Sequence, residues 1–402
     1  MSTHTMSWVL TDVASETYVE NFSITNEDLA IESRLPFSIT KRRLRGGMSD
    51  GVDLIEVVNG PLRFTICPTR GMGIWRGQFD SWNLGWKAPI HGPVHPNYVN
   101  RDELGGIGWL QGFDEWIVRC GLNNNGGPAV DRLLDNTGAE QSMALPLHGR
   151  IANIPAHQVT VTVDTKAPHT LTVTGIVDES MLFFPQLRLQ TEIKTNPGSP
   201  SFTIHDRVIN LRSQPAEFEL LYHCNFGQPL LDDGSKFRAP VKRLAPINDV
   251  AQKALSRWDT YPAPTAGIVE ECFLMQLLGE KESGRTITML ENPAGDKACA
   301  LRFSLDQLPW FTLWRNPGAV SDGYVTGLEP ATDFPNAKPF ERSKGRVLTL
   351  PAGGSYDAEL TVELASSKEE VDRWKGEISA IQKQADTQID SHIPADWSPA
   401  GE

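Results

Sequence analysis

Cysteine is scarce in this chain, and its placement argues against two classes of protein. The five cysteines are spread over 402 residues, and no two of them form a Cys-x-x-Cys pair. An odd number of widely spaced cysteines fits neither a disulfide framework nor a zinc knuckle. We therefore expect reduced, buried thiols, which favour a cytoplasmic location. The positions concerned are Cys67, Cys120, Cys224, Cys272 and Cys299.

Long apolar runs are also missing. No segment approaches the roughly 20 apolar residues that a membrane-spanning helix needs. Residues 1–20 are polar and acidic, whereas a signal peptide needs a basic start followed by an apolar core. We expect a soluble protein that has no membrane partner and is not exported.

Positive charge is in deficit. The chain has 37 Lys and Arg against 50 Asp and Glu, which gives a net charge of −13. Nucleic-acid binding needs clustered basic side chains, and the longest basic run, residues 41–45, is typical of a solvated turn. Nucleic acid is therefore not an expected partner, and the acidity of the chain suits a neutral ligand.

Several cofactor and nucleophile motifs do not occur. The sequence has no Gly-rich loop of the P-loop or dinucleotide type and no Gly-x-Ser-x-Gly nucleophile elbow. His91 and His95 are four residues apart, but Pro93 and Pro96 rule out a regular helix that would bring them to one face. A metal site is not expected there.

Short alternating runs, separated by Gly, Pro, Asn and Asp, are what the chain has in abundance from about residue 36 onward. Five of them follow almost directly on one another, and no crossover helix separates them. They are residues 158–164, 170–177, 187–194, 201–209 and 216–222. This pattern predicts an all-β, mainly antiparallel fold. Later runs extend it, at residues 285–290, 298–303, 310–314, 346–350 and 355–364.

Three parts of the chain are distinguished by composition. Residues 1–35 suggest an N-terminal extension with a short helix over 26–34, capped by Asn26. Residues 36–365 have no linker and no fixed repeat, so we expect one domain of two sheets packed face to face. Residues 366–402 form the third part.

The third part begins with a predicted helix. Ser366 or Ser367 is a plausible cap. The apolar residues recur at spacings of three and four, as on one face of a helix; they are Val371, Trp374, Ile378 and Ile381. From about residue 385 the chain is polar, and we expect a loose tail.

The segment 145–156 places a histidine and an arginine among apolar residues. In an extended chain, His148 and Arg150 share one face. Gly149 between them leaves room for a ligand to approach the backbone. The alternative is a structural histidine packed under a loop.

The segment 218–229 alternates cleanly. One face carries only apolar side chains: Phe218, Leu220, Tyr222, Cys224 and Phe226. The other face carries Leu221, His223 and Asn225. A histidine and an amide side by side can hydrogen-bond sugar hydroxyls or a ring oxygen, although they can equally form a structural pair.

A late carboxylate follows in segment 327–337. Its two prolines predict a loop that leaves a strand ending near Leu328, so that Glu329 is held rigidly but remains accessible. Asp333 competes for the same role, and either carboxylate alone could be ordinary surface.

Segment 109–128 combines aromatics, amides and glycines. Aromatic faces cover the C–H side of a pyranose and amides bind its hydroxyls, so Trp109 and Asn124 are candidates for a sugar platform. The glycines are equally what a long turn needs. Arg70, between turn residues, would add a cation to the same pocket.

The order of these segments resembles a known superfamily. His148-Gly149, then Tyr222-His-x-Asn-Phe226, then Leu328-Glu-Pro-x5-Asn-Ala337 is similar to the aldose 1-epimerase, or galactose mutarotase-like, superfamily. Residues 147–156 and 120–122 resemble its divergent DUF4432 branch. The resemblance extends over about residues 40–365 and implies a galactose mutarotase-like β-supersandwich.

The resemblance also implies an isomerase and a role for each matched residue. His223 would protonate the ring oxygen, Glu329 would take the anomeric hydroxyl proton, and His148 would hold the substrate. The ring would open, rotate about C1–C2 and close as the other anomer of a free or modified sugar. This chemistry needs an acid and a base and no cofactor.

One departure from the superfamily concerns substrate binding. The N-terminal Arg- and Asn-rich segment of typical mutarotases is not recognisable in this chain. The expected substrate-binding residues are instead Arg70, Trp109, Asn124, Arg150 and Asn225.

Two other functions use the same residues. His148, His223 and Glu329 could be ligands of a divalent metal ion in a keto-sugar isomerase or lyase. Alternatively, the protein binds sugar without catalysis. A homo-oligomer formed through an exposed edge strand is a further open expectation.

Overall fold

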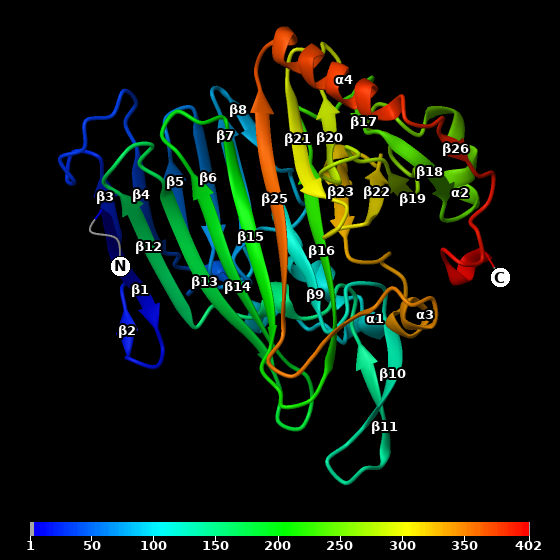
Figure 1. Cartoon of the computed structure of the whole chain (residues 1–402), viewed down its shortest axis with the longest axis horizontal. Coiled ribbons are helices and arrows are strands. Elements are labelled where there is room, and N and C mark those ends of the chain that lie inside the picture. The colour runs from blue at the N-terminus through cyan, green and yellow to red at the C-terminus, as the bar shows by residue number, and fades with distance from the viewer. Residues whose placement is uncertain (1–3, 402) are drawn as a thin grey trace.

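Two large, mostly antiparallel sheets pack face to face in the computed structural model, which describes residues 4–401 (Figure 1). The ten-stranded sheet contains, in spatial order, β17 (Lys236–Arg238), β20 (Arg285–Glu291), β21 (Ala298–Ser304), β25 (Ser355–Ala365), β15 (Ser201–Asn210), β14 (Gln186–Thr195), β13 (Leu171–Ser180), β12 (Gln158–Asp164), β1 (Thr5–Asp12) and β2 (Thr17–Tyr18).

The second sheet has fourteen strands and carries the site described below. Its order is β26 (Gln388–Ile389), β18 (Val241–Pro246), β19 (Glu271–Leu277), β22 (Trp310–Asn316), β23 (Val325–Ala331), β16 (Ala216–Phe226), β9 (Ile117–Leu122), β7 (Gly73–Phe79), β6 (Leu62–Cys67), β5 (Asp53–Val58), β4 (Ser38–Arg43) and β3 (Phe22–Thr25), with β24 (Leu348–Leu350) beside β16 and β8 (Trp82–Leu84) beside β7.

The remaining elements lie at the periphery. A separate hairpin of β10 (Ala129–Leu134) and β11 (Glu140–Leu145) projects from one end of the sandwich, as Figure 1 shows. The α-helices are α1 (Glu103–Gly106), α2 (Asp249–Lys253), α3 (Lys338–Ser343) and α4 (Lys368–Gln382). Among residues 4–401, no helix is both long and apolar enough to cross a membrane.

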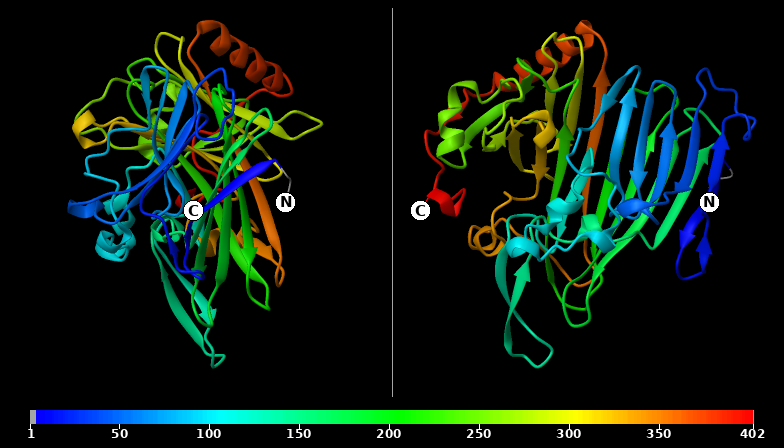
Figure 2. Two further views of the ribbon diagram at one scale, coloured as in Figure 1. Left: turned by 90° about the vertical axis from the view of Figure 1, so that its left-hand side faces the viewer. Right: turned by 180° about the vertical axis from the view of Figure 1, so that it is seen from behind.

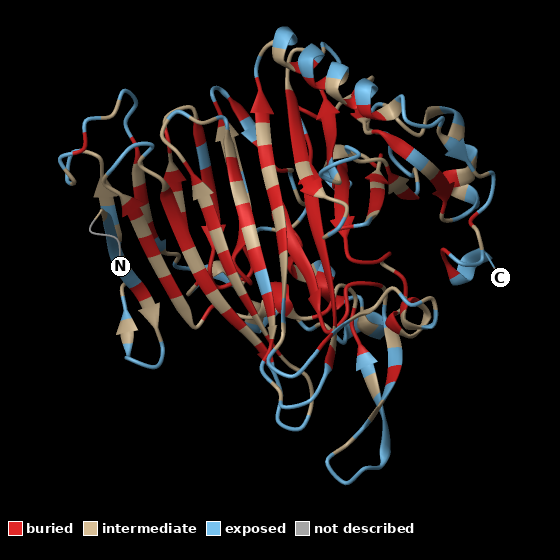
Figure 3. Cartoon of the chain, viewed as in Figure 1, coloured by how far each residue is buried: buried red, intermediate tan, exposed pale blue. Residues whose placement is uncertain are grey.

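The period-two pattern of the sequence is what builds the core. Along β14, buried and half-buried residues alternate without a break, so one face packs inward and the other remains partly exposed. Figure 3 shows the same banding on the neighbouring strands. Aromatic side chains meet across the two sheets: Phe64 on β6 stacks on Phe202 of β15, with ring centroids 4.6 Å apart. The predicted all-β sandwich is confirmed.

The five successive runs between residues 158 and 222 divide between the sheets. β12, β13, β14 and β15 are antiparallel neighbours in the ten-stranded sheet. The fifth, β16, crosses to the other sheet, where it pairs with β9 and β23. The two sheets seen edge-on in Figure 2 are therefore joined by the chain at this point.

The N-terminal residues differ from the sequence-based expectation. β1 pairs with β12 and β2, and β3 pairs with β4, so residues that suggested an extension contribute strands to both sheets. The helix predicted over residues 26–34 is not formed, and turns occupy residues 26–30. Asn26 Oδ1 accepts a hydrogen bond from the backbone N–H of Phe37, across the turn, and does not cap a helix.

The C-terminal helix is confirmed, and the loose tail is not. α4 begins after Ser367, whose side chain accepts from the N–H of Glu370, and its four predicted apolar residues are buried. The tail docks as a parallel strand, β26, beside β18. Beyond it, Trp397 is buried against Trp310 and Phe334, and this apolar contact offsets the entropy cost of ordering the tail.

All five cysteines are free thiols, as predicted, and four of them are buried.

Candidate active site

The site is built on the face of β16 that points away from the sandwich core. The five apolar residues predicted to share one face all belong to the core cluster between the sheets. Leu221 belongs to a separate aromatic cluster on the opposite face, and by alternation His223 and Asn225 face the same way. The predicted division of this strand is confirmed.

His223 and Glu329 meet across neighbouring strands. Nε2 of His223 lies 3.2 Å from Oε1 of Glu329, and both residues are at most 4% exposed. Gly327 makes this approach feasible, because a Cβ at that position would lie 2.4 Å from Glu329 Oε1 and 2.9 Å from His223 Cε1.

Glu329 does not lie at the start of a loop, as the two prolines suggested. It lies inside β23, which continues through Pro330 to Ala331. The ladder between β23 and β16 is interrupted between Leu328 and Ala331. Proline, which has no N–H to donate, is tolerated at such a break. The carboxylate is consequently buried in the sheet and is not placed on an exposed turn.

Asn225 fixes the tautomer of His223. Its Nδ2 donates to the backbone carbonyls of Glu115 (3.0 Å) and His223 (3.1 Å), so the amide oxygen must face the imidazole. That oxygen lies 2.6 Å from His223 Nδ1, which therefore carries the hydrogen. Nε2 is left as a bare acceptor directed at Glu329.

Burial shifts both partners toward their neutral forms. It lowers the pKa of His223 well below its usual value, and the nearby His148 adds to the effect. Burial raises the pKa of Glu329 well above its usual value, and the charge of Glu270 contributes. Both shifts favour a neutral pair, with one proton on Glu329 facing the bare nitrogen of His223.

His148 reaches the same place from a turn, not from a strand. Its φ of 56° lies in the left-handed region, which is uncommon outside glycine and often marks functional sites. Its N–H donates to Gly126 O (2.9 Å), and its Nδ1 lies 2.7 Å from Asn125 O. Because a carbonyl can only accept, Nδ1 carries the hydrogen and Nε2 is bare. Burial lowers the pKa of His148 to about 4.

The two imidazoles are surrounded by aromatic rings. Their ring centroids are 5.4 Å apart, so the predicted convergence of the histidines is present. Trp109 lies 4.7 Å from His148 and 6.3 Å from His223 between centroids. Its buried Nε1 has no hydrogen-bond partner in the described part of the chain.

Two residues of the site were not predicted from the sequence. Phe113 and Trp314 lie 5.1 Å and 5.4 Å from the ring of His223. Trp314 is on β22, directly opposite Gly327 of β23. Only the strand register places it beside the histidine, so no local motif could have identified it.

Three predicted substrate-binding residues lie elsewhere. Arg70 is fully buried, with donors directed at Glu115, Asn153 and the carbonyls of Val94 and Gly112. It braces loops: four of its five N–H groups are engaged within the protein, and the side chain is fully buried. Asn124 and Arg150 line a neighbouring cavity, which His148 does not line. Asn225, a fourth predicted substrate-binding residue, instead hydrogen-bonds His223 Nδ1 and orients the imidazole.

Asp333, the competing carboxylate, has a different place. It is buried, and its Oδ1 accepts from Asn125 Nδ2 at 2.7 Å. Glu219 accepts from the N–H of the same Asn125, whose carbonyl holds His148. Burial raises the pKa of Asp333 well above its usual value, and that of Glu219 to about 7. This carboxyl pair therefore positions the loop whose Asn125 carbonyl accepts the hydrogen bond from His148 Nδ1.

The metal alternative would use His148, His223 and Glu329 as ligands. Across residues 4–401, no three His, Cys, Asp or Glu side chains are grouped as a metal ion would require. The arrangement provides instead one carboxyl proton, two bare imidazole nitrogens and an aromatic wall. Such a set can give a proton to one oxygen of a bound molecule and take a proton from another.

The sequence and the fold were compared with known proteins. The family model described as a domain of unknown function, DUF4432, matches residues 49–364. No curated protein matches the chain. A Klebsiella pneumoniae protein classed provisionally as an aldose 1-epimerase is 34% identical over 97% of this chain and 99% of its own, with a TM-score of 0.91.

More distant structures share the fold. A galactose mutarotase-like protein from Clostridium acetobutylicum is 14% identical, covers 80% of this chain and 97% of its own, and has a TM-score of 0.53. An Escherichia coli K12 protein, also classed provisionally as an aldose 1-epimerase, is 13% identical with a TM-score of 0.52, over 79% of this chain and all of its own. The chain therefore belongs to the DUF4432 family, and its fold is galactose mutarotase-like.

Proposed function

We propose that the protein is an isomerase that interconverts the anomers of a free or modified sugar by acid–base catalysis. The observation that carries this proposal is the buried His223–Glu329 contact, with His148 and Trp109 beside it. The provisional classification of the Klebsiella pneumoniae relative supports the same activity. The proposed reaction uses no cofactor.

The single proton of the pair is sufficient for the reaction. Its transfer from Glu329 to His223 Nε2 creates an ion pair with no proton taken from solvent. His223 then gives this proton to the ring oxygen while Glu329 removes the anomeric hydroxyl proton, and the bond between C1 and the ring oxygen breaks. An open-chain aldehyde forms, and the pair is again neutral. Rotation about C1–C2 and the reverse steps give the other anomer.

The remaining residues have supporting roles in this proposal. The bare Nε2 of His148 accepts a hydrogen bond from a sugar hydroxyl, and Trp109 Nε1, unpartnered among residues 4–401, donates one. The faces of the surrounding aromatic rings cover C–H groups of the sugar. Asn225 and Asn125 hold the tautomers that leave both Nε2 atoms bare.

Anomer exchange measured by NMR on a panel of neutral and anionic aldoses tests the proposal. We expect acceleration by the wild type and a loss of about 10²–10⁴-fold in Glu329→Gln and His223→Asn, the usual worth of a positioned acid or base. Glu56→Gln on β5 and His205→Asn on β15 are matched controls distant from the site, and they should retain activity.

Full activity of Glu329→Gln would refute the acid–base assignment. If the wild type binds a sugar of the panel but exchanges none, and both variants bind it equally well, the protein is a sugar-binding protein and not an isomerase.

A further inference from the structure

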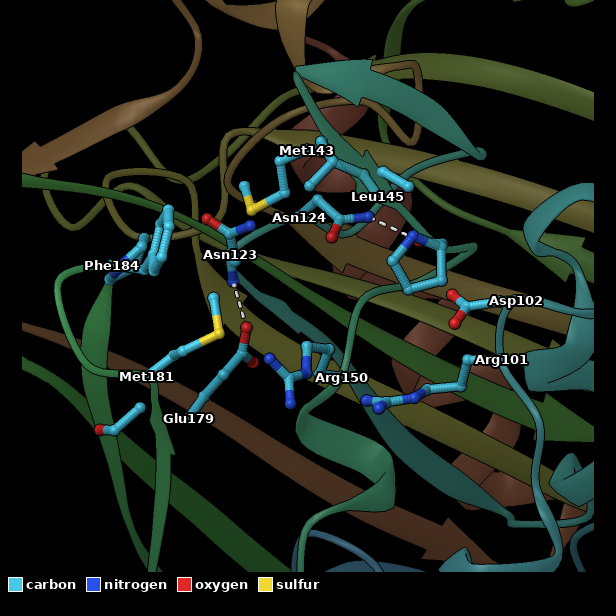
Figure 4. A pocket seen from close by; sticks show the side chains of 14 residues that line it. Arg101, Asp102, Asn123, Asn124, Met143, Leu145, Arg150, Glu179, Met181 and Phe184 are labelled. Atoms are coloured by element: carbon cyan, nitrogen blue, oxygen red, sulfur yellow. Dashed lines mark hydrogen bonds between the residues drawn. The ribbon is translucent and has the colours of Figure 1, made fainter. Parts of the chain in front are cut away.

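A cavity of about 240 Å³ adjoins the loops that hold His148 (Figure 4). It is far larger than the roughly 10–15 Å³ that one water needs, so it can admit a small molecule. Its walls come from residues 101–102 before α1, the loop after β9, the end of β11 with the residues that follow it, and the end of β13 with the turn to β14. None of the residues that act in the proposed isomerase reaction lines this cavity.

Two arginines in this cavity have no directly ion-paired or hydrogen-bonded carboxylate in the described part of the chain. Arg101 and Arg150 both line it, yet neither forms an ion pair nor donates a side-chain hydrogen bond within the described residues. Burial lowers the pKa of Arg101 and the positive charge of Arg150 lowers it further, while the charges of Glu179 and Asp102 act in the opposite direction. Two guanidinium groups close enough to repel one another are stabilised when an anion lies between them.

The carboxylates of the cavity act on the arginines through their charge but do not pair with them directly. Glu179 uses its two oxygens to accept the backbone N–H groups of Leu122 (2.8 Å) and Asn123 (3.2 Å). Asp102 also lines the cavity. Over residues 4–401, neither carboxylate forms an ion pair with Arg101 or Arg150.

Two further polar atoms are buried without partners. Asn124 is 2% exposed, and its Nδ2 donates to Pro146 O at 2.7 Å, which leaves Oδ1 unsatisfied among the described residues. Arg150 Nε is buried and unpartnered as well. Buried polar atoms are normally hydrogen-bonded, so a ligand that supplies a donor for Asn124 and an acceptor for Arg150 would complete the site.

Apolar side chains form the rest of the wall. Met143, Leu145, Met181 and Phe184 line the same cavity and can cover the C–H groups of a ligand. A carboxylate or phosphate group, a hydroxyl and a C–H-rich body are combined in sugar acids and sugar phosphates.

We propose that this cavity binds a small organic anion, whose carboxylate or phosphate lies between Arg101 and Arg150 and whose hydroxyl donates to Asn124 Oδ1. The proposal does not depend on the isomerase activity, because His148, His223 and Glu329 are outside the cavity. The two sites are nevertheless linked. Arg150 follows His148 by two residues, so their Cα atoms are at most about 7 Å apart.

Calorimetric titration of the full-length protein tests the site, with glucuronate, glucose 6-phosphate, inorganic phosphate and neutral glucose as probes. We expect at least one of the three anions to bind, and Arg101→Gln and Arg150→Gln each to weaken that binding at least tenfold. Arg132→Gln, an exposed arginine of the nearby β10 that pairs with Glu140, is the matched control and should bind as the wild type does. If Arg150→Gln does not fold, Arg101→Gln still tests the site independently.

Competition between ligands shows whether the bound anion is a group of the substrate or a separate molecule. If the anion is part of the substrate, glucose will compete with glucuronate or glucose 6-phosphate. Arg150→Gln will then raise KM for the anionic sugar. If it is a separate ligand, inorganic phosphate will bind without competition from glucose. Either result supports the site.

The same titrations in Glu329→Gln separate this proposal from the proposed function, since anion binding should persist in that variant. The proposal is overturned if none of the three anions binds at millimolar concentration, or if Arg132→Gln weakens binding as much as the two cavity variants do.

Discussion

Gly327 shows at the residue scale how tightly the site is packed. A Cβ there would overlap Glu329 Oε1 and crowd His223, so Gly327→Ala must push the pair apart. We expect at least a tenfold loss of kcat, since small displacements of acid–base groups are costly. Gly376→Ala, on α4 with open space around it, is the control for anomer-exchange rates, and equal activity of the two variants would contradict the packing argument.

Single residues also determine how kcat/KM depends on pH. The pKa of His148 is lowered to about 4, and His223 is lowered as well, so neither imidazole gains a proton as pH falls from 7 to 5. The raised pKa of Glu329 favours retention of the shared proton over the same range. We expect kcat/KM for a neutral sugar to stay level from pH 7 to pH 5, and a decline centred near 6.5 would show that an ordinary histidine controls the rate.

At the scale of elements, the loop after β9 depends on a carboxyl pair beneath it. Asp333 and Glu219 both hold Asn125, whose carbonyl fixes His148. Their raised pKa values fit a proton shared between them. An amide at position 333 can still accept from Asn125 and donate to Glu219, whereas a methyl group can do neither.

We therefore expect Asp333→Asn to keep most of the kcat and Asp333→Ala to lose it, with KM for the sugar changed less. The pH profile of Asp333→Ala should also show an altered titration of His148. Asp357→Asn and Asp357→Ala, on β25, are the paired controls. If both Asp333 variants are equally inactive and equally destabilised, the role of Asp333 is structural only.

For the whole molecule, the docked C-terminus closes the open end of the fourteen-stranded sheet. Trp397 fills a buried cluster with Trp310 of β22 and Phe334. Trp397→Ala should lower the free energy of unfolding by about 3–5 kcal/mol, the usual cost of removing a buried tryptophan. Ile389→Ala, in the same tail but exposed, should change it little. Equal midpoints of denaturant unfolding would show that the tail does not stabilise the fold.

Local information in the sequence was sufficient for much of this protein. The alternation along residues 158–222 specified strands, because side chains of a strand point alternately to its two faces. The faces of β16 and the four buried residues of α4 followed from the same period arguments. His148, His223 and Glu329 were identified by their order along the chain, which needs no knowledge of contacts.

Long-range pairing decided the rest. The sequence could not show that residues 5–12 pair with β12 or that Trp397 returns to β22, since these segments are distant along the chain. It could not show that Trp314 lies opposite Gly327, because that contact depends on the strand register. The protonation of the site is likewise tertiary. The hydrogen bond from His223 Nδ1 to Asn225 leaves Nε2 of His223 bare, and burial favours the proton on Glu329.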